Sequence, residues 1–234
     1  MTYVVDLQKI TKTFPGVIAN SNVTLSIEKG EIHALVGENG AGKTTLMNIL
    51  YGLQQPDSGG IFLNGKPVSI RNPQGAIALG IGMVHQHFML VPSLTVLENI
   101  IMGKEITRYS LIDYRKAKKL INEISLRFGI DTDPSKKIFD LSVGEMQRVE
   151  ILKALYRGAD ILILDEPTSV LTPQEIDKLF SVLREFTKQG KSVIFITHKL
   201  KEVLAISDRV TVMRNGKVTG NVSSKETDEK QLAR

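Results

Sequence analysis

A glycine-rich segment constrains this chain more than any other feature of its sequence. Residues 37–44, GENGAGKT, fit the pattern G-x-x-x-x-G-K-[ST] at every fixed position. An apolar run precedes the segment and a helix-forming run follows it, as a strand–loop–helix unit requires. Glycines let successive backbone N–H groups point at one anion, and the helix dipole adds to the attraction. The pattern predicts a loop that holds the phosphates of a nucleoside triphosphate. A glycine-rich turn that binds nothing is the weaker alternative.

Two side chains of this loop have specific expected roles. We expect Lys43 to reach the β- and γ-phosphates and the Thr44 hydroxyl group to bind Mg²⁺. The predicted nucleotide-binding residues of the loop are Gly37, Glu38, Asn39, Gly40, Ala41, Gly42, Lys43, Thr44 and Thr45.

Two adjacent carboxylates end a second apolar run, ILIL at 161–164. A buried strand would deliver Asp165 and Glu166 to the carboxyl edge of a sheet, where open α/β folds bind ligands. We expect Asp165 to hold Mg²⁺ through water and Glu166 to polarise an attacking water. A strand that ends in acids is common by itself. Beside a phosphate loop it indicates nucleotide hydrolysis.

A second helix start also suggests anion binding. Ser142 and Glu145 have the spacing of a capping box, which explains a helix start without any function. Gly144 is left unexplained, since alanine suits the first turn of a helix better. A glycine there would let an anion approach the backbone closely. Ser142, Gly144 and Glu145 therefore form a second predicted phosphate-binding site.

The order of strand and helix signals predicts an α/β fold. Signals alternate after residue 160 and predict a parallel sheet covered by helices: strand 161–164, helix 173–189, strand 192–197, helix 200–205 and strand 210–213. Four earlier runs predict an antiparallel sheet beside the nucleotide site: 3–7, 23–27, 32–36 and 61–63. Between these regions Thr95 and Asp113 are expected to cap helices. We interpret the chain as one P-loop NTPase domain, with a core over about 1–90 and 156–234, an N-terminal antiparallel β subdomain, and an inserted helical subdomain over about 91–155.

Composition excludes several classes of protein. The 234 residues include no cysteine, so disulfides and thiolate zinc sites are impossible. The net charge is only +5, and no aromatics interleave with the basic residues, which disfavours a nucleic-acid interface. No apolar run approaches the roughly 18 residues of a membrane span, and the first residues do not resemble a signal peptide. We expect a cytoplasmic protein that does not itself cross a bilayer.

Together these motifs resemble the ATP-binding cassette of ABC transporters, over essentially the whole chain. LSVGE at 141–145 is similar to the LSGGQ-type signature of that family, and the motifs follow the family's order. The resemblance implies that Gln86 is the Q-loop residue, which senses the γ-phosphate and Mg²⁺ together with the switch residue His198. It also implies that Phe14 stacks on adenine. The implied catalytic residues are Glu166, His198, Gln86 and Lys43, and the implied metal-binding residues are Thr44, Gln86 and Asp165.

The resemblance also implies partners and a location. Two cassettes would enclose two ATP molecules, each between the phosphate loop of one cassette and the signature helix of the other. Transmembrane permease subunits would hold the chain at the cytoplasmic face of the membrane, near residues 86–103, and an extracytoplasmic solute-binding protein would act indirectly. The chain looks most like the first cassette of sugar and nucleoside importers, which usually carry two cassettes in one polypeptide. We therefore expect the natural chain to continue beyond Arg234.

Two alternatives and one departure accompany this interpretation. A soluble ABC-type ATPase that acts on nucleic acid or ribosomes would be expected to carry long basic or coiled-coil insertions, and this sequence has none. A non-hydrolysing regulatory cassette would be expected to lack Glu166 or Lys43. The departure is Thr172, which stands where the family usually has aspartate. Threonine also caps helices, so the fold should survive, while a charged contact across the dimer is in doubt.

Overall fold

The computed structural model describes residues 3–232, and its main feature is a six-stranded sheet of order β12-β11-β3-β10-β9-β6. Within it β12 is antiparallel to β11 and the other pairs are parallel. The strands are β3 (Ile32–Val36), β6 (Ile81–Val84), β9 (Ile161–Asp165), β10 (Ser192–Ile196), β11 (Arg209–Arg214) and β12 (Lys217–Ser223). The predicted parallel sheet is confirmed.

A separate four-stranded antiparallel sheet has the order β2-β1-β4-β5. Its strands are β1 (Tyr3–Phe14), β2 (Val17–Glu28), β4 (Ser58–Leu63) and β5 (Lys66–Val68). The predicted antiparallel sheet is confirmed, but the assignment of residues 32–36 to it was wrong. These residues form β3, whose five residues are all buried and which pairs in parallel with β10 and β11. A strand covered on both faces is apolar throughout, which is typical of parallel sheets.

Helices cover the sheets and form most of the region between β6 and β9. They are α1 (Lys43–Leu50), α2 (Pro73–Ala78), α3 (Val96–Ile101), α4 (Tyr114–Phe128), α5 (Val143–Tyr156), α6 (Pro173–Lys188), α7 (Leu200–Ile206) and α8 (Glu229–Leu232), with 3-10 turns η1 (Ile138–Asp140) and η2 (Ser224–Glu226). The predicted side-chain caps at Thr95, Asp113, Ser142 and Thr172 are confirmed. The acidic residues Asp228 and Glu229 also predict a helix start near the end of the sequence. Helix α8 begins at Glu229, and Ala233 and Arg234 lie outside the described residues. Among residues 3–232, none of the helices combines the length and apolar character that crossing a bilayer requires.

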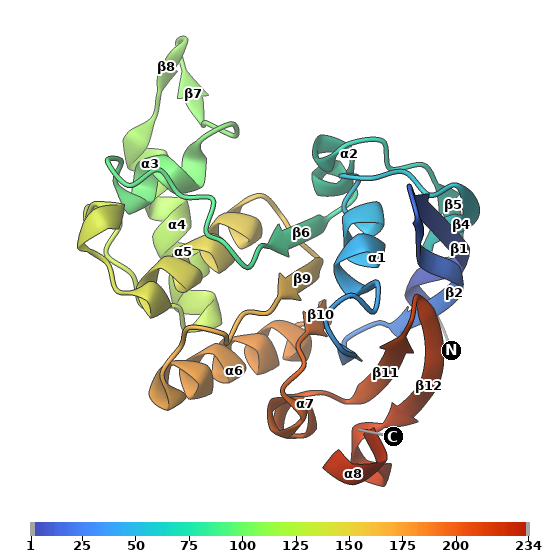
Figure 1. Cartoon of the computed structure of the whole chain (residues 1–234). Helices are drawn as coiled ribbons and strands as arrows, with labels where there is room; N and C mark the ends of the chain where they lie inside the picture. Colours follow the sequence, from blue (N-terminus) through green and yellow to red (C-terminus); the bar gives the residue numbers. More distant parts are fainter. Residues whose placement is uncertain (1–2, 233–234) are drawn as a thin grey trace.

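The elements between β6 and β9 gather on one side of the molecule. Figure 1 shows α3, α4 and α5 there, opposite the antiparallel sheet, with α1 and the parallel sheet between the two groups. A short hairpin, β7 (Thr107–Arg108) and β8 (Leu111–Ile112), extends from the helical group. The sequence did not predict this hairpin, because two-residue strands show no periodicity and the turn places Tyr109 and Ser110 at positive φ without a glycine.

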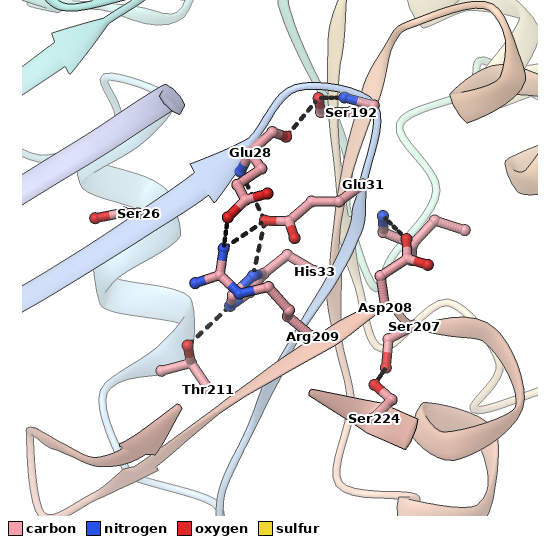
Figure 2. Close-up of polar contacts among 12 residues, drawn as sticks. Ser26, Glu28, Glu31, His33, Ser192, Ser207, Asp208, Arg209, Thr211 and Ser224 are labelled. Carbon is pink, nitrogen blue, oxygen red and sulfur yellow. Dashed lines mark hydrogen bonds and ion pairs between the residues drawn. The ribbon is translucent and has the colours of Figure 1, made fainter. Parts of the chain in front are cut away.

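A partly buried polar network joins the end of β2 to the amino ends of the parallel strands. Arg209 Nη1 lies 3.0 Å from Glu28 Oε1 and 3.5 Å from Glu31 Oε1, as Figure 2 shows. The His33 ring is fully buried between Glu31 Oε1 at 3.1 Å and Thr211 Oγ1 at 2.8 Å. This arrangement fixes the antiparallel sheet against the core. It also leaves the opposite, carboxyl edge of the parallel sheet for the site.

Candidate active site at the carboxyl edge of the sheet

Loops from four parallel strands meet at one cavity of about 620 Å³. The phosphate loop follows β3, Gln86 follows β6, Asp165 and Glu166 end β9, and His198 follows β10. Since parallel strands end at the same edge, residues far apart in sequence come together there. The lining residues are Phe14, Val17, Ala19, Asn39, Gly40, Ala41, Gly42, Lys43, Thr44, Thr45, Gln86, Asp165, Glu166, Ser169 and His198.

The remaining predicted site residues lie elsewhere. Gly37 and Glu38 line an adjacent cavity of about 510 Å³, which His198 also borders. Ser142, Gly144 and Glu145 do not line the nucleotide-sized cavity; they form the first turn and cap of α5. The chain by itself therefore presents two separate regions. One has the phosphate loop and the carboxylates, and the other has the signature-like helix start.

The phosphate loop needs its glycines for close packing as well as for its backbone shape. Gly42 has φ of 96°, and a Cβ atom there would lie 2.2 Å from the carbonyl oxygen of Ala19. A Cβ atom on Gly37 would lie 2.2 Å from the carbonyl oxygen of Met213. Any side chain at either position would therefore displace backbone. The loop is held open against β2 and β11, with the start of α1 facing the cavity.

Lys43 is folded back over the loop. Its Nζ donates hydrogen bonds to the carbonyl oxygens of Gly37, at 2.7 Å, and Glu38, at 3.0 Å. Burial lowers the pKa of Lys43, and the carboxylates of Glu166 and Asp165 act in the opposite direction. The first turn of α1 contains no acidic residue. The loop thus presents an ammonium group and free amides to any anion in the cavity.

The two carboxylates at the end of β9 differ in their surroundings. Burial raises the pKa of Asp165, while a hydrogen bond with the Thr44 side chain lowers it. Thr44 and Asp165 thus meet as an oxygen pair of the kind that Mg²⁺ prefers. Glu166 has a φ of 48°, an unusual backbone conformation for a residue with a side chain, which turns it away from the direction of the strand.

One carboxylate oxygen of Glu166 contacts His198, and the other has no hydrogen-bond partner among the described residues. Its Oε1 lies 2.9 Å from His198 Nδ1. Its Oε2 is buried and has no hydrogen-bond partner among the described residues. A buried acceptor without a donor is costly, and Glu166 lines the cavity, so a bound water can satisfy this oxygen.

At the opposite wall, Phe14 and Val17 face each other across the β1–β2 hairpin, with 40% and 61% of their surfaces exposed. Phe14 was predicted from the sequence, whereas Val17, Ala19 and Ser169 also line the cavity and were not predicted. The turn residues Pro15 and Gly16 predict a tight hairpin, which would place Val17 directly opposite Phe14.

At the second region, a carboxylate of the same chain lies against Gly144. A Cβ atom on Gly144 would lie 2.2 Å from Glu175 Oε1. The backbone N–H of Gly144 helps to lower the pKa of Glu175, after the larger effects of hydrogen bonds from Thr172. Glu175 Oε2 accepts from the Thr172 N–H and hydroxyl groups, each at 3.0 Å. The glycine does make room for an anion, and in this structure that anion is Glu175.

The sequence profile of the ABC transporter family matches residues 20–169. The chain belongs to that family. Among solved structures, one similar fold is a nucleotide-free ATP-binding cassette from an ABC transporter, with a TM-score of 0.87 and 25% identity over 99% of this chain and 96% of that one. A second is an ABC cassette in its ADP conformation, with a TM-score of 0.88 and 25% identity over 100% of this chain and 96% of that one.

Curated members of the ABC family are more similar in sequence. The nucleoside import ATP-binding protein NupA of Lactococcus lactis is 54% identical over 98% of this chain. The guanosine import ATP-binding protein NupO of Bacillus subtilis is 54% identical over 100% of it. The glucose import ATP-binding protein TsgD13 of Haloferax volcanii is 48% identical over 97%. In each case the match covers 46% of the relative, so the chain spans about half the length of the curated relatives it matches.

Proposed function

We propose that this chain binds and hydrolyses ATP to drive an ABC importer for a nucleoside or a simple sugar. The convergence of the phosphate loop, Asp165, Glu166 and His198 on one cavity is the observation that carries this proposal. The solute class rests on the printed names of the relatives, since nothing in the cavity would contact a transported solute.

The residues present fit ATP and Mg²⁺. The loop keeps its shape only with glycine at positions 37 and 42, because a side chain at either would displace backbone. Thr44 and Asp165 provide oxygen ligands, and Gln86 lines the same cavity. Mg²⁺ would neutralise charge on the phosphates. Lys43 would hold the phosphates, Glu166 would accept a hydrogen bond from the attacking water through its free oxygen, and His198 would orient Glu166.

The proposed partners are membrane permease subunits and a second ABC cassette, with a solute-binding protein acting indirectly. A cavity of about 260 Å³ between α2 and α5 is a candidate docking site for a permease subunit. Leu53 lines it and is 49% exposed. Leu53→Glu should abolish transport by the assembled importer and leave ATP hydrolysis intact. The second cassette would meet the α5 start, which lies outside the nucleotide cavity here.

Glu166→Gln tests the proposed hydrolysis. The variant should bind MgATP normally and hydrolyse it at least ~100-fold more slowly, because the amide cannot act as a general base. Single-turnover hydrolysis and equilibrium binding measure the two effects separately. Glu123→Gln, at a 60% exposed position on α4, is the matched control. Near-normal turnover in Glu166→Gln would assign the water-activating role to another group.

A further inference from the structure

The segment that follows Gln86 is fixed to α5 through the backbone N–H and carbonyl groups of Met89. The Met89 N–H donates to Glu150 Oε1 at 2.6 Å, and its carbonyl oxygen accepts from Lys153 Nζ at 3.0 Å. Glu150 and Lys153 lie one turn apart on α5, with 3.7 Å between Lys153 Nζ and Glu150 Oε2. One ion pair of α5 therefore satisfies both polar groups of a residue from a distant segment.

A second polar side chain holds the same segment two residues later. Asn99 of α3 accepts the Val91 N–H at 2.7 Å and donates to the Val91 carbonyl at 3.1 Å. It also donates to the Thr95 carbonyl at 2.9 Å. Both α3 and α5 thus bind the backbone of this segment through both a donor and an acceptor.

Burial makes the contact at Met89 costly to lose. Glu150 is 7% exposed, and the side chain of Lys153 is 14% exposed. Burial is also the main cause that lowers the pKa of Lys153. A buried charge needs hydrogen bonds as well as an opposite charge, and the Met89 peptide provides one to each partner. Apolar residues would pack the inner face of α5 equally well, so packing alone does not explain this pair.

We propose that Glu150 and Lys153 are positioning residues, which set the place of Gln86 in the nucleotide cavity by fixing the Met89 peptide to α5. Gln86 lies three residues before Met89, so their Cα atoms are within about 11 Å of each other. The start of α5 carries Ser142 and Gly144. One helix therefore connects the signature end to the residue at the γ-phosphate position. The proposal rests on the proposed function, because it takes Gln86 to act on bound ATP.

A double-mutant cycle distinguishes positioning from a merely structural role. Glu150→Ala should slow single-turnover hydrolysis by about 10- to 100-fold, the scale expected when a reacting group is displaced by about 1 Å. Its affinity for MgATP should change less than about 2-fold, since the phosphate loop is untouched. In a Gln86→Ala background, Glu150→Ala should add less than about 2-fold. Glu150→Gln should restore most of the rate, because the amide oxygen still accepts from the Met89 N–H.

The matched control is Tyr156→Phe, on the same helix. It removes a hydrogen bond to the Lys104 carbonyl, 3.3 Å long, and should leave the rate unchanged. Equal slowing by Glu150→Ala in both backgrounds, or a parallel loss of ATP affinity, would overturn the positioning role. If Glu150→Ala does not fold, Lys153→Met replaces it in the cycle, since it removes the donor to the Met89 carbonyl and the ion pair with Glu150 but keeps Glu150 as the acceptor of the Met89 N–H.

Hydrogen exchange tests the contact without nucleotide. The Met89 amide should exchange at least about 10-fold faster in Glu150→Ala than in the unaltered chain. Unchanged exchange would show that Glu150 does not hold this peptide, and the proposal would be wrong. An unaltered chain that binds no MgATP would instead contradict the proposed function.

Discussion

The starts of α1 and α5 are two solutions to the same problem, a helix end with unpaired N–H groups. At α1 the cap is Gly42, which has no side chain, and the first turn contains no acidic residue. At α5 Ser142 and Glu145 form a complete capping box, and Glu175 lies against Gly144. One end is open to an outside anion. The other is already occupied by carboxylates of its own chain.

This difference shows that a helix start alone does not define a phosphate site. The resemblance to ABC cassettes implies that both ends bind phosphate, yet only α1 presents free amides beside a lysine and a cavity. For the α5 end to contact a nucleotide of a partner cassette, Glu175 would have to give up the Gly144 amide. The proposed cassette–cassette contact therefore involves an exchange of anions at α5.

The largest effect is expected at the open end. Lys43→Ala removes the ammonium group that lies over the loop and should weaken MgATP binding at least about 100-fold, the scale of a lost charge-assisted contact. Isothermal titration calorimetry measures the affinity, and thermal unfolding reports on the fold. Lys66→Ala, at an exposed position of β5, is the control. Unchanged affinity in a folded variant would remove the phosphate loop from the proposed site.

A carboxylate added to the first turn of α1, like the one in the first turn of α5, should also weaken ATP binding. Thr45 is the third residue of α1 and lines the cavity, so Thr45→Glu places a carboxylate where α5 has Glu145. ATP affinity should fall about 10-fold or more, while thermal stability stays the same or rises, because acids favour helix starts. Thr45→Gln separates charge from size and should bind ATP more tightly than Thr45→Glu. Equal affinities would mean that the charge at this helix end is unimportant.

Smaller effects are expected where α5 meets Glu175. An added Cβ at Gly144 would displace the Glu175 carboxylate and break the hydrogen bonds that this carboxylate accepts. Gly144→Ala should therefore lower the free energy of unfolding. In a Glu175→Ala background the same change should be neutral or stabilising, which gives a coupling of about 1 kcal/mol. Urea unfolding of the four proteins measures it. Additive effects would show that the two residues do not interact in solution.

The smallest expected effect is on how strongly acid lowers the thermal stability. Hydrogen bonds from Thr172 lower the pKa of Glu175, and a hydrogen bond from the Ser142 backbone lowers the pKa of Glu145. A carboxylate with a lowered pKa stabilises the fold above its unfolded value of 4.5, and this contribution is lost as the pH falls below that value. The double variant Glu145→Gln, Glu175→Gln should therefore show a weaker decline of thermal stability below about pH 4.5. An identical decline would assign the acid sensitivity to other carboxylates.

Local patterns predicted the local features of both helix ends. The glycine pattern fixed the position of the phosphate loop, and the spacing of Ser142 and Glu145 predicted a capping box that the structure contains. The contact of Gly144 with Glu175 could not be predicted, because it depends on where the tertiary structure places the start of α6 relative to the start of α5. Glu150 was missed for the same reason: in the sequence it is one more charged residue on a helix. Its burial follows from the position of a segment 61 residues away.

The position of β3 has a consequence for how the chain folds. This strand pairs Ile32 with Val193, so its neighbour β10 is made 161 residues later (193 − 32). At a synthesis rate of about 5–20 residues per second, that delay is roughly 10–30 s. During this delay the phosphate loop has been synthesised, but β10, which supports it, has not. The contacts among α3, α4 and α5 are local in sequence and can form early. On the ribosome, the ability to bind nucleotide should therefore be one of the last properties that this domain acquires.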